Sequence, residues 1–168
     1  MQALLSFDKA PPFAAPLRFF LTAPFFALLA GLLLVWEGPS LLVSRWTPGT
    51  LAATHLLTIG FMLQIMLGAL IQVLPVVAGV NIAHPLTVSR WLHGGLSIGT
   101  LLLAAGFQFG EPDALAMAAI ILGLTITGFL MVVAPPLFRV SSTSPTIRGL
   151  KFAMLGLVGT IALGVVLA

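Results

Sequence analysis

The sequence predicts an all-α integral membrane protein, a single-domain bundle of about five transmembrane helices. Hydrophobic residues make up 60% of the 168 residues, whereas charged residues make up only 7%. A soluble domain carries roughly 25% charged residues, because water must solvate its surface. Seven basic and four acidic side chains are too few for that purpose. We therefore expect most of the surface to face lipid.

Five stretches are long and apolar enough to cross a bilayer, which takes about 20 residues of helix. Turn signals separate them, including Gly38-Pro39, His84-Pro85 and Glu111-Pro112. Pro135-Pro136 is expected to stop the fourth helix, because proline interrupts helical hydrogen bonding. The expected spans cover residues 17–36, 51–77, 88–109, 113–134 and 149–168.

The distribution of basic residues predicts the orientation of these spans. With the N-terminus inside the cell, six of the seven basic residues fall on the cytoplasmic side, and Arg45 falls outside. The acidic residues Glu37, Glu111 and Asp113 then also fall outside. Basic loops are enriched on the cytoplasmic side of membranes. We therefore expect a cytoplasmic N-terminus in a multi-pass protein of the cell membrane.

Several functional classes are excluded by what the sequence lacks. Without Cys there is no disulfide, thiolate metal site or thiol catalysis. The basic residues are scattered singly, without the basic patch that a nucleic-acid partner would need. The sequence also has no Gly-rich phosphate loop, no Ser–His–Asp set and no acidic residue in the interior of a span. Neither a hydrolase nor an autonomous proton pump is expected.

Small residues at four-residue spacing predict close helix packing, because lipid offers little hydrophobic drive for association. The third expected span contains Gly95 and Gly99, with Gly106 and Gly110 at its end. The fifth contains Gly156, Thr160 and Gly164. We expect packing within the monomer in preference to a contact with another subunit.

The second expected span, residues 51–77, carries the most informative polar residues. A polar side chain at membrane depth is costly and therefore indicates function. If the whole span is α-helical, successive residues are rotated by about 100° around the helix axis, and four side chains then share one face. They are His55, Ile59, Met62 and Met66. This face would present one nitrogen and two thioethers to a neighbouring helix.

The opposite side of the same span is expected to make different contacts. Gln64 would face nearly opposite to His55 and address another helix. Gly60 and Gly68 flank that side. Because they lack side chains, either a second backbone or a flat ligand could approach them closely.

His55 has three interpretations. As a neutral imidazole it could be an axial haem ligand, with Met62 and Met66 packing on the macrocycle. Alternatively, the His and Met side chains could bind Cu(I), which prefers soft ligands. In the third interpretation, His55 is hydrogen-bonded to a neighbouring backbone carbonyl and has no ligand.

His93 and His84 are weaker candidates. His93 begins the third span beside Gly94 and Gly95, where a ring could approach closely, and is a candidate for a second metal site. His84 lies in a Pro-containing loop and is expected to be solvated. With a helical rise of 1.5 Å per residue, we expect His55 and His93 to lie at membrane depths that differ by roughly 20 Å. One haem iron cannot take both as axial ligands.

One run of residues in the second span resembles a known family. The run reads Thr54-His55-x4-Gly60-Phe61-x6-Gly68-x6-Pro75-x3-Gly79. It resembles the second helix of the haem–copper oxidase subunit I superfamily, and also the haem- and copper-containing NnrS proteins associated with nitric-oxide stress. In the oxidases, a His near the outer end of that helix ligates the low-spin haem. The resemblance implies that role for His55, which the predicted orientation places at the same face.

The resemblance is concentrated in residues 51–80. Oxidase subunits have about twelve helices, and the later histidines that complete their haem and copper sites have no counterpart here. The resemblance therefore implies haem binding, with b-type haem expected, in a bacterial inner membrane. It does not imply a complete oxidoreductase.

We expect a membrane haem-binding protein that serves electron transfer, haem handling or oxygen- and nitric-oxide-related stress. His55 would be the axial ligand, with Met62, Met66, Gly60 and Gly68 shaping the pocket. A homodimer sharing one haem or a larger membrane complex could supply the second ligand. The alternatives are a Cu(I)-binding or transport protein and a cofactor-free structural subunit of a membrane complex.

Overall fold

The computed structural model describes residues 9–141 and 144–167, and the regular structure in these residues is entirely helical. Among these residues, five helical stretches are long and apolar enough to cross a membrane, which confirms the predicted bundle. The elements are α1 (Ala14–Glu37), η2 (Gly38–Leu42), α2 (Pro48–His55), η3 (Leu56–Leu63), α3 (Gln64–Ala78), α4 (Pro85–Phe109), α5 (Pro112–Arg139) and α6 (Pro145–Leu167).

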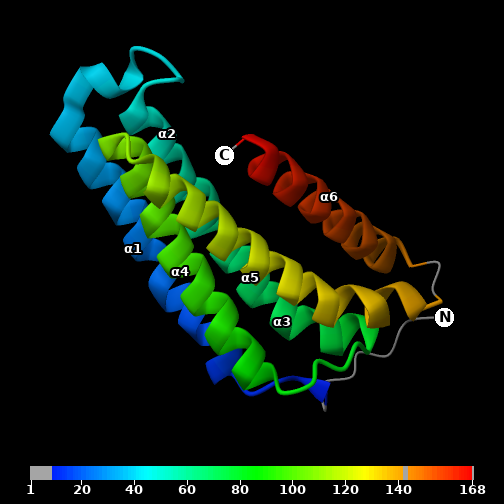
Figure 1. Ribbon diagram of the computed structural model, residues 1–168. Helices are drawn as coiled ribbons and strands as arrows, with labels where there is room; N and C mark the ends of the chain where they lie inside the picture. The colour runs from blue at the N-terminus through cyan, green and yellow to red at the C-terminus, as the bar shows by residue number, and fades with distance from the viewer. Residues whose placement is uncertain (1–8, 142–143, 168) are drawn as a thin grey trace.

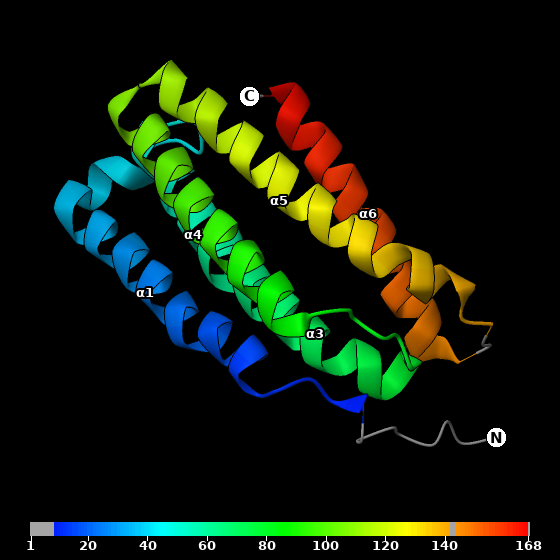
Figure 2. The same cartoon turned by 60° about the horizontal axis from the view of Figure 1, so that its bottom comes forward.

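The spans run alternately up and down, with α4 in the middle of the bundle (Figures 1 and 2). α4 packs against α1, against the second span (α2, η3 and α3) and against α5, whereas α6 packs mainly on α5. We call the end where α1 finishes the Glu37 end. The opposite end, where α4 begins, is the His84 end.

Prolines and glycines set the boundaries of these helices. Pro48, Pro85, Pro112 and Pro145 are each the first residue of a helix. Proline suits that position, because its fixed φ is helical and its missing N–H would be unpaired there anyway. Gly79 and Gly110 follow the ends of α3 and α4, with φ of 65° and 67°. Glycine adopts this left-handed conformation without the steric cost that a Cβ would impose.

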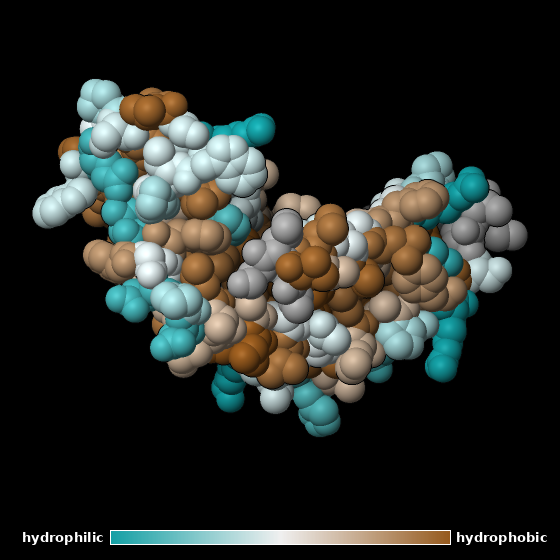
Figure 3. Space-filling model, turned by 45° about the horizontal axis from the view of Figure 1, so that its top comes forward, coloured by the Kyte–Doolittle hydropathy of each residue, from teal (hydrophilic) through white to brown (hydrophobic). Residues whose placement is uncertain are grey.

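In the part of the chain that the structure describes, charged side chains lie toward the two ends of the bundle. Hydrophobic side chains dominate the middle of the face in Figure 3, and hydrophilic ones gather toward its periphery. The Glu37 end carries Arg45 and three acidic residues, Glu37, Glu111 and Asp113. The basic residues of the His84 end are Lys9, Arg18, Arg90, Arg139, Arg148 and Lys151.

The predicted stop of the fourth span at Pro135-Pro136 is wrong. α5 continues through both prolines to Arg139. Val133 and Leu137, on either side of the prolines, are completely buried. Packing thus continues along the helix, and transmembrane helices tolerate proline where neighbouring groups satisfy the freed backbone. At the end of this helix, Lys151 Nζ of α6 donates a hydrogen bond to Val140 O over 2.8 Å.

The second span is not the uniform α-helix that the sequence predicted. Its middle segment, η3, is a π-helix, whose i→i+5 hydrogen bonds make a wider turn. Burial in this span repeats every four residues, at Ala52, Leu56, Gly60, Gln64 and Gly68. In an α-helix of 3.6 residues per turn, such a series drifts steadily around the axis. The wider π turns offset that drift and keep the series on one packed face.

Candidate functional site

His55 lies at the end of α2, near the Glu37 end of the bundle, and its ring is partly buried. Its Nδ1 is 2.7 Å from Leu51 O, one turn earlier in the helix. Because a carbonyl oxygen only accepts, Nδ1 carries the proton, and in the neutral ring Nε2 keeps its lone pair. The ring stacks on Phe107 of α4, with centroids 5.0 Å apart and planes 23° apart. The imidazole is thus held in one tautomer and one orientation.

The predicted face shared by His55 and the two methionines is wrong. Because burial in the second span repeats every four residues, His55 shares a face with the partly buried Ile59 and Leu63. Met62 and Met66 align instead with Thr54 and Thr58, on an adjacent, exposed face. Both methionines are more than half exposed, so neither points into the bundle with His55.

The space over Gly60 and Gly68 is filled by α1. A Cβ on Gly60 would overlap the ring of Phe26, and one on Gly68 would lie 2.8 Å from Phe19 Cβ. Of the two expected occupants, a neighbouring helix and a flat ligand, the neighbouring helix is present here. The aromatic side chains of α1 leave no room for a macrocycle against these glycines.

Gln64 is completely buried and, as expected, addresses another helix. Its Nε2 donates a hydrogen bond to Ser97 Oγ of α4 over 3.2 Å. Its Oε1 is buried and has no hydrogen-bond partner in the part of the chain that the structure describes. An unpaired amide oxygen in a protein core is costly, so this atom is a candidate for an unassigned contact.

The other two histidines are placed differently. His93 Nε2 is 2.9 Å from Thr22 Oγ1 of α1, and its ring meets Phe19 edge-on at a centroid distance of 5.4 Å. His84 is exposed in the loop before α4. His55 stacks on Phe107, which follows His93 by 14 residues on α4. At 1.5 Å per residue the two histidines are therefore about 20 Å apart in depth, in agreement with the prediction.

A polar pair at the Glu37 end was missed by the sequence reasoning. Gln108 Nε2 donates a hydrogen bond to Glu37 Oε1 over 2.6 Å, joining the end of α4 to the end of α1. The Glu37 carboxylate also lies against Gly49, in the first turn of α2. A helix N-terminus favours such a charge. The signal in the sequence was a Gln at the end of a span, but its partner is 71 residues away.

The two sets of small residues behave differently. A Cβ on Gly95 would overlap Thr125, and one on Gly99 would lie 2.6 Å from Leu122 Cγ, so both glycines contact α5. Packing within the monomer is therefore confirmed for α4. In α6, Gly156 and Gly164 have nothing within 4 Å of an added Cβ, and Thr160 is exposed.

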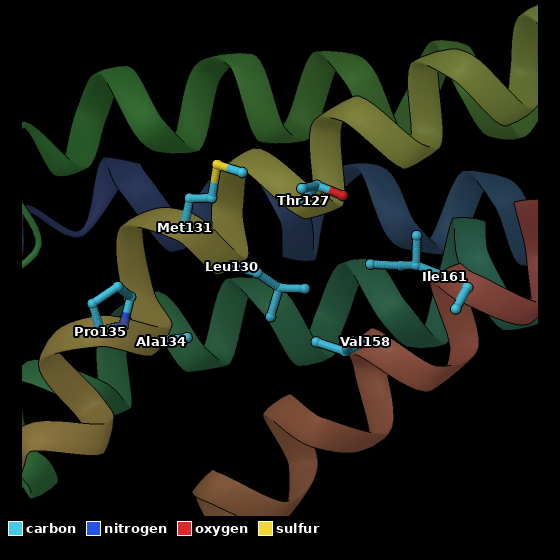
Figure 4. Close-up of a pocket in the computed structure, with 8 residues that line it drawn as sticks. Thr127, Leu130, Met131, Ala134, Pro135, Val158 and Ile161 are labelled. Carbon is cyan, nitrogen blue, oxygen red and sulfur yellow. The ribbon is translucent and has the colours of Figure 1, made fainter.

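An open apolar groove of about 440 Å³ lies between parts of α5 and α6. Figure 4 shows Leu130 and Thr127 of α5 on one side and Val158 and Ile161 of α6 on the other. Its lining is almost wholly apolar, and the Thr127 hydroxyl alone would do little to orient a polar ligand. His55 does not border it.

Comparison of the chain with family models, with curated proteins and with solved structures finds no match.

Proposed function

We propose that this chain is a membrane haem-binding protein in which His55 is the axial ligand. The supporting observation is the hydrogen bond between His55 Nδ1 and Leu51 O. Metal-ligating histidines almost always donate their second ring N–H in this way, which fixes the tautomer and raises ligand basicity. Nε2 has no hydrogen-bond partner among the residues that the structure describes, so its lone pair is available.

The stacking of His55 on Phe107 also supports this assignment. A ligand that is already fixed in orientation loses little conformational entropy when it binds a metal. The ring is only partly buried, so a macrocycle would bind at the surface of α2 rather than inside the bundle. Bound haem would supply one-electron transfer or binding of a diatomic gas. A second axial ligand would come from another subunit, such as His55 of a second copy.

The geometry favours haem over Cu(I). A Cu(I) site would need His55 to converge with Met62 and Met66, but the methionines belong to the adjacent exposed face. Soft thioethers on a different face cannot complete a compact coordination sphere around the same ion.

The charge distribution supports a further proposal about orientation. The His84 end carries six basic residues, so it would face the cytoplasm, in a bacterial inner membrane. Val43, which is 79% exposed, lies at the opposite end. A Val43→Cys variant should then react with an impermeant maleimide added to intact spheroplasts, and reaction only after lysis would reverse the orientation.

The test is an absorption spectrum of detergent-purified protein from cells with ample haem, taken oxidised and then dithionite-reduced. We expect a Soret band and a sharp reduced α-band that disappear in His55→Ala. His84→Ala is the matched control, because it removes an exposed imidazole and should keep the spectrum. Far-UV circular dichroism of each variant checks that the helices are intact.

Two outcomes would overturn the assignment. Full haem occupancy in a folded His55→Ala variant would mean that another residue holds the group. A colourless, iron-free wild-type protein would rule out haem. Copper in such a sample, lost in Met62→Leu/Met66→Leu, would favour the Cu(I) alternative, and no metal at all would favour a structural subunit.

A further inference from the structure

Polar residues line one face of α4 from its start to its middle. Ser89, His93, Ser97 and Thr100 follow one another at spacings of four, four and three residues. At 100° per residue this series stays on one side of the helix, and consecutive members are separated by about 4.5–6 Å along the axis. Ser89 and Thr100 are completely buried. A polar group therefore occurs at every turn from the His84 end to the middle of the span.

The helices beside this face add polar groups at the same depths. Thr22 of α1 contacts His93, and Gln64 of α3 donates to Ser97. Gln72 follows Gln64 by eight residues, which places it about 12 Å nearer the His84 end. We call this boundary between α1, α3 and α4 the polar seam.

Two glutamines of α3, of which Gln64 lies in the polar seam, have buried side-chain oxygens without partners. Neither Gln64 Oε1 nor Gln72 Oε1 has a hydrogen-bond partner in the described chain. Rotating the Gln64 amide by 180° does not remove the unpaired group. Ser97 Oγ would then donate to the amide oxygen, and the NH2 group would have no partner. Buried amide groups in proteins are almost always paired, and ordered water is the usual partner where protein atoms supply none.

Beyond Thr100 the same face of α4 becomes apolar. Ala104 packs in a cluster with Phe26 and Ala30 of α1 and Ala52 and Leu56 of the second span. We call this cluster the apolar plug. It separates the polar seam from the Gln108–Glu37 pair at the other end, and it offers water no hydrogen-bond partner.

We propose that water enters the bundle from the His84 end along the polar seam and stops at the Gln64 amide, where the apolar plug begins. The seam is thus a half-channel that hydrates one side of the membrane interior to mid-depth. Its ligand is water, held by the Gln64 amide and the Ser97 hydroxyl. This inference does not depend on haem binding.

The absence of Cys from the sequence allows a direct test with single cysteines in the full-length, detergent-solubilised protein. Ser97→Cys is nearly isosteric and reports on the seam. Ala104→Cys reports on the plug, and Ile98→Cys reports on a surface that is 56% exposed and covered by detergent. The probe is Ag+, which is close to water in size and reacts with thiolates. The remaining thiols are counted with a maleimide after unfolding in SDS.

We expect Ser97→Cys to be consumed about tenfold faster than Ala104→Cys or Ile98→Cys, because a thiolate forms readily only where it is solvated. Adding Gln64→Leu to the Ser97→Cys variant should slow the reaction of its thiol. Equal slow rates in all three variants would mean that the seam is dry. A fast reaction of the Ala104→Cys variant would mean that the plug does not seal, and either result would overturn the half-channel.

A second measurement leaves Ser97 unchanged. In glutamine-15N-labelled wild-type protein, magnetisation transfer from water to side-chain NH2 groups can be followed by solid-state NMR. The Gln64 resonance is identified by its loss in Gln64→Leu. We expect early transfer to this group, whereas transfer delayed to the rate of the apolar core would contradict the proposal.

Discussion

α4 and α6 are helices of similar length, 25 and 23 residues, yet they are packed very differently. In the most apolar stretch of α4, 39% of the residues are buried, compared with 11% in α6. α4 packs against α1, the second span and α5, whereas α6 packs mainly on α5. Both helices carry small residues four apart. Their surroundings therefore differ more than their sequences.

The difference shows what holds a helix in a membrane bundle. Because lipid is as apolar as a Leu side chain, burial alone stabilises helix contacts little, and close packing and hydrogen bonds must do so. α4 has both, through Gly99 against Leu122 and through the bonds of Gln64 to Ser97 and of Gln108 to Glu37. In α6, the hydroxyl of Thr160 bonds only to Gly156 O of its own helix.

The largest expected difference concerns the glycines. Gly99→Leu should lower the free energy of unfolding by about 3 kcal/mol or more, because its side chain would overlap Leu122 of α5. Gly159→Leu in α6 is the matched variant and should change stability by less than about 0.5 kcal/mol, since nothing lies within 4 Å. Unfolding in SDS, followed by circular dichroism, measures both. Equal losses would mean that the glycines of α6 are packed as tightly as those of α4.

A smaller difference is expected for the hydroxyl groups. Ser97→Ala should cost about 1 kcal/mol, because it removes the interhelical partner of the buried Gln64 amide. Thr160→Val should stay within about 0.5 kcal/mol, because that residue is exposed. In the double variant Gln64→Leu/Ser97→Ala, the loss should be smaller than the sum of the single losses. Additive losses would show that the two side chains are not coupled.

The smallest expected loss of stability concerns the contact between Lys151 of α6 and the end of α5. Lys151 Nζ donates to Val140 O and lies 5.9 Å from the Phe138 ring centroid, both at the end of α5. Lys151→Met should cost only about 0.5 kcal/mol, since a partly exposed ammonium group gains little net free energy from a cation–π contact and one backbone hydrogen bond. A loss larger than that of Ser97→Ala, in the same unfolding assay, would mean that this contact anchors α6 more firmly than its packing suggests.

The sequence by itself determined the five spans and most of their ends. Whether a segment enters lipid depends on the apolar character of about 20 successive residues, which is a local property. Prolines and glycines set most helix ends for equally local reasons, through their own φ angles. For the candidate site, the sequence also identified His55, Gln64 and His93 as polar groups inside spans, and their depths follow from helical rise alone.

Only the tertiary structure decided which side chains meet. Contact with α1 and α4 keeps a four-residue repeat buried in the second span, and the π-helix that follows moves Met62 away from the face of His55. Packing around Val133 and Leu137 likewise carries α5 past two prolines. The partners of Gln64 and Gln108 lie 33 and 71 residues away. Such contacts depend on how whole helices fit together, and no local pattern in a chain specifies that fit.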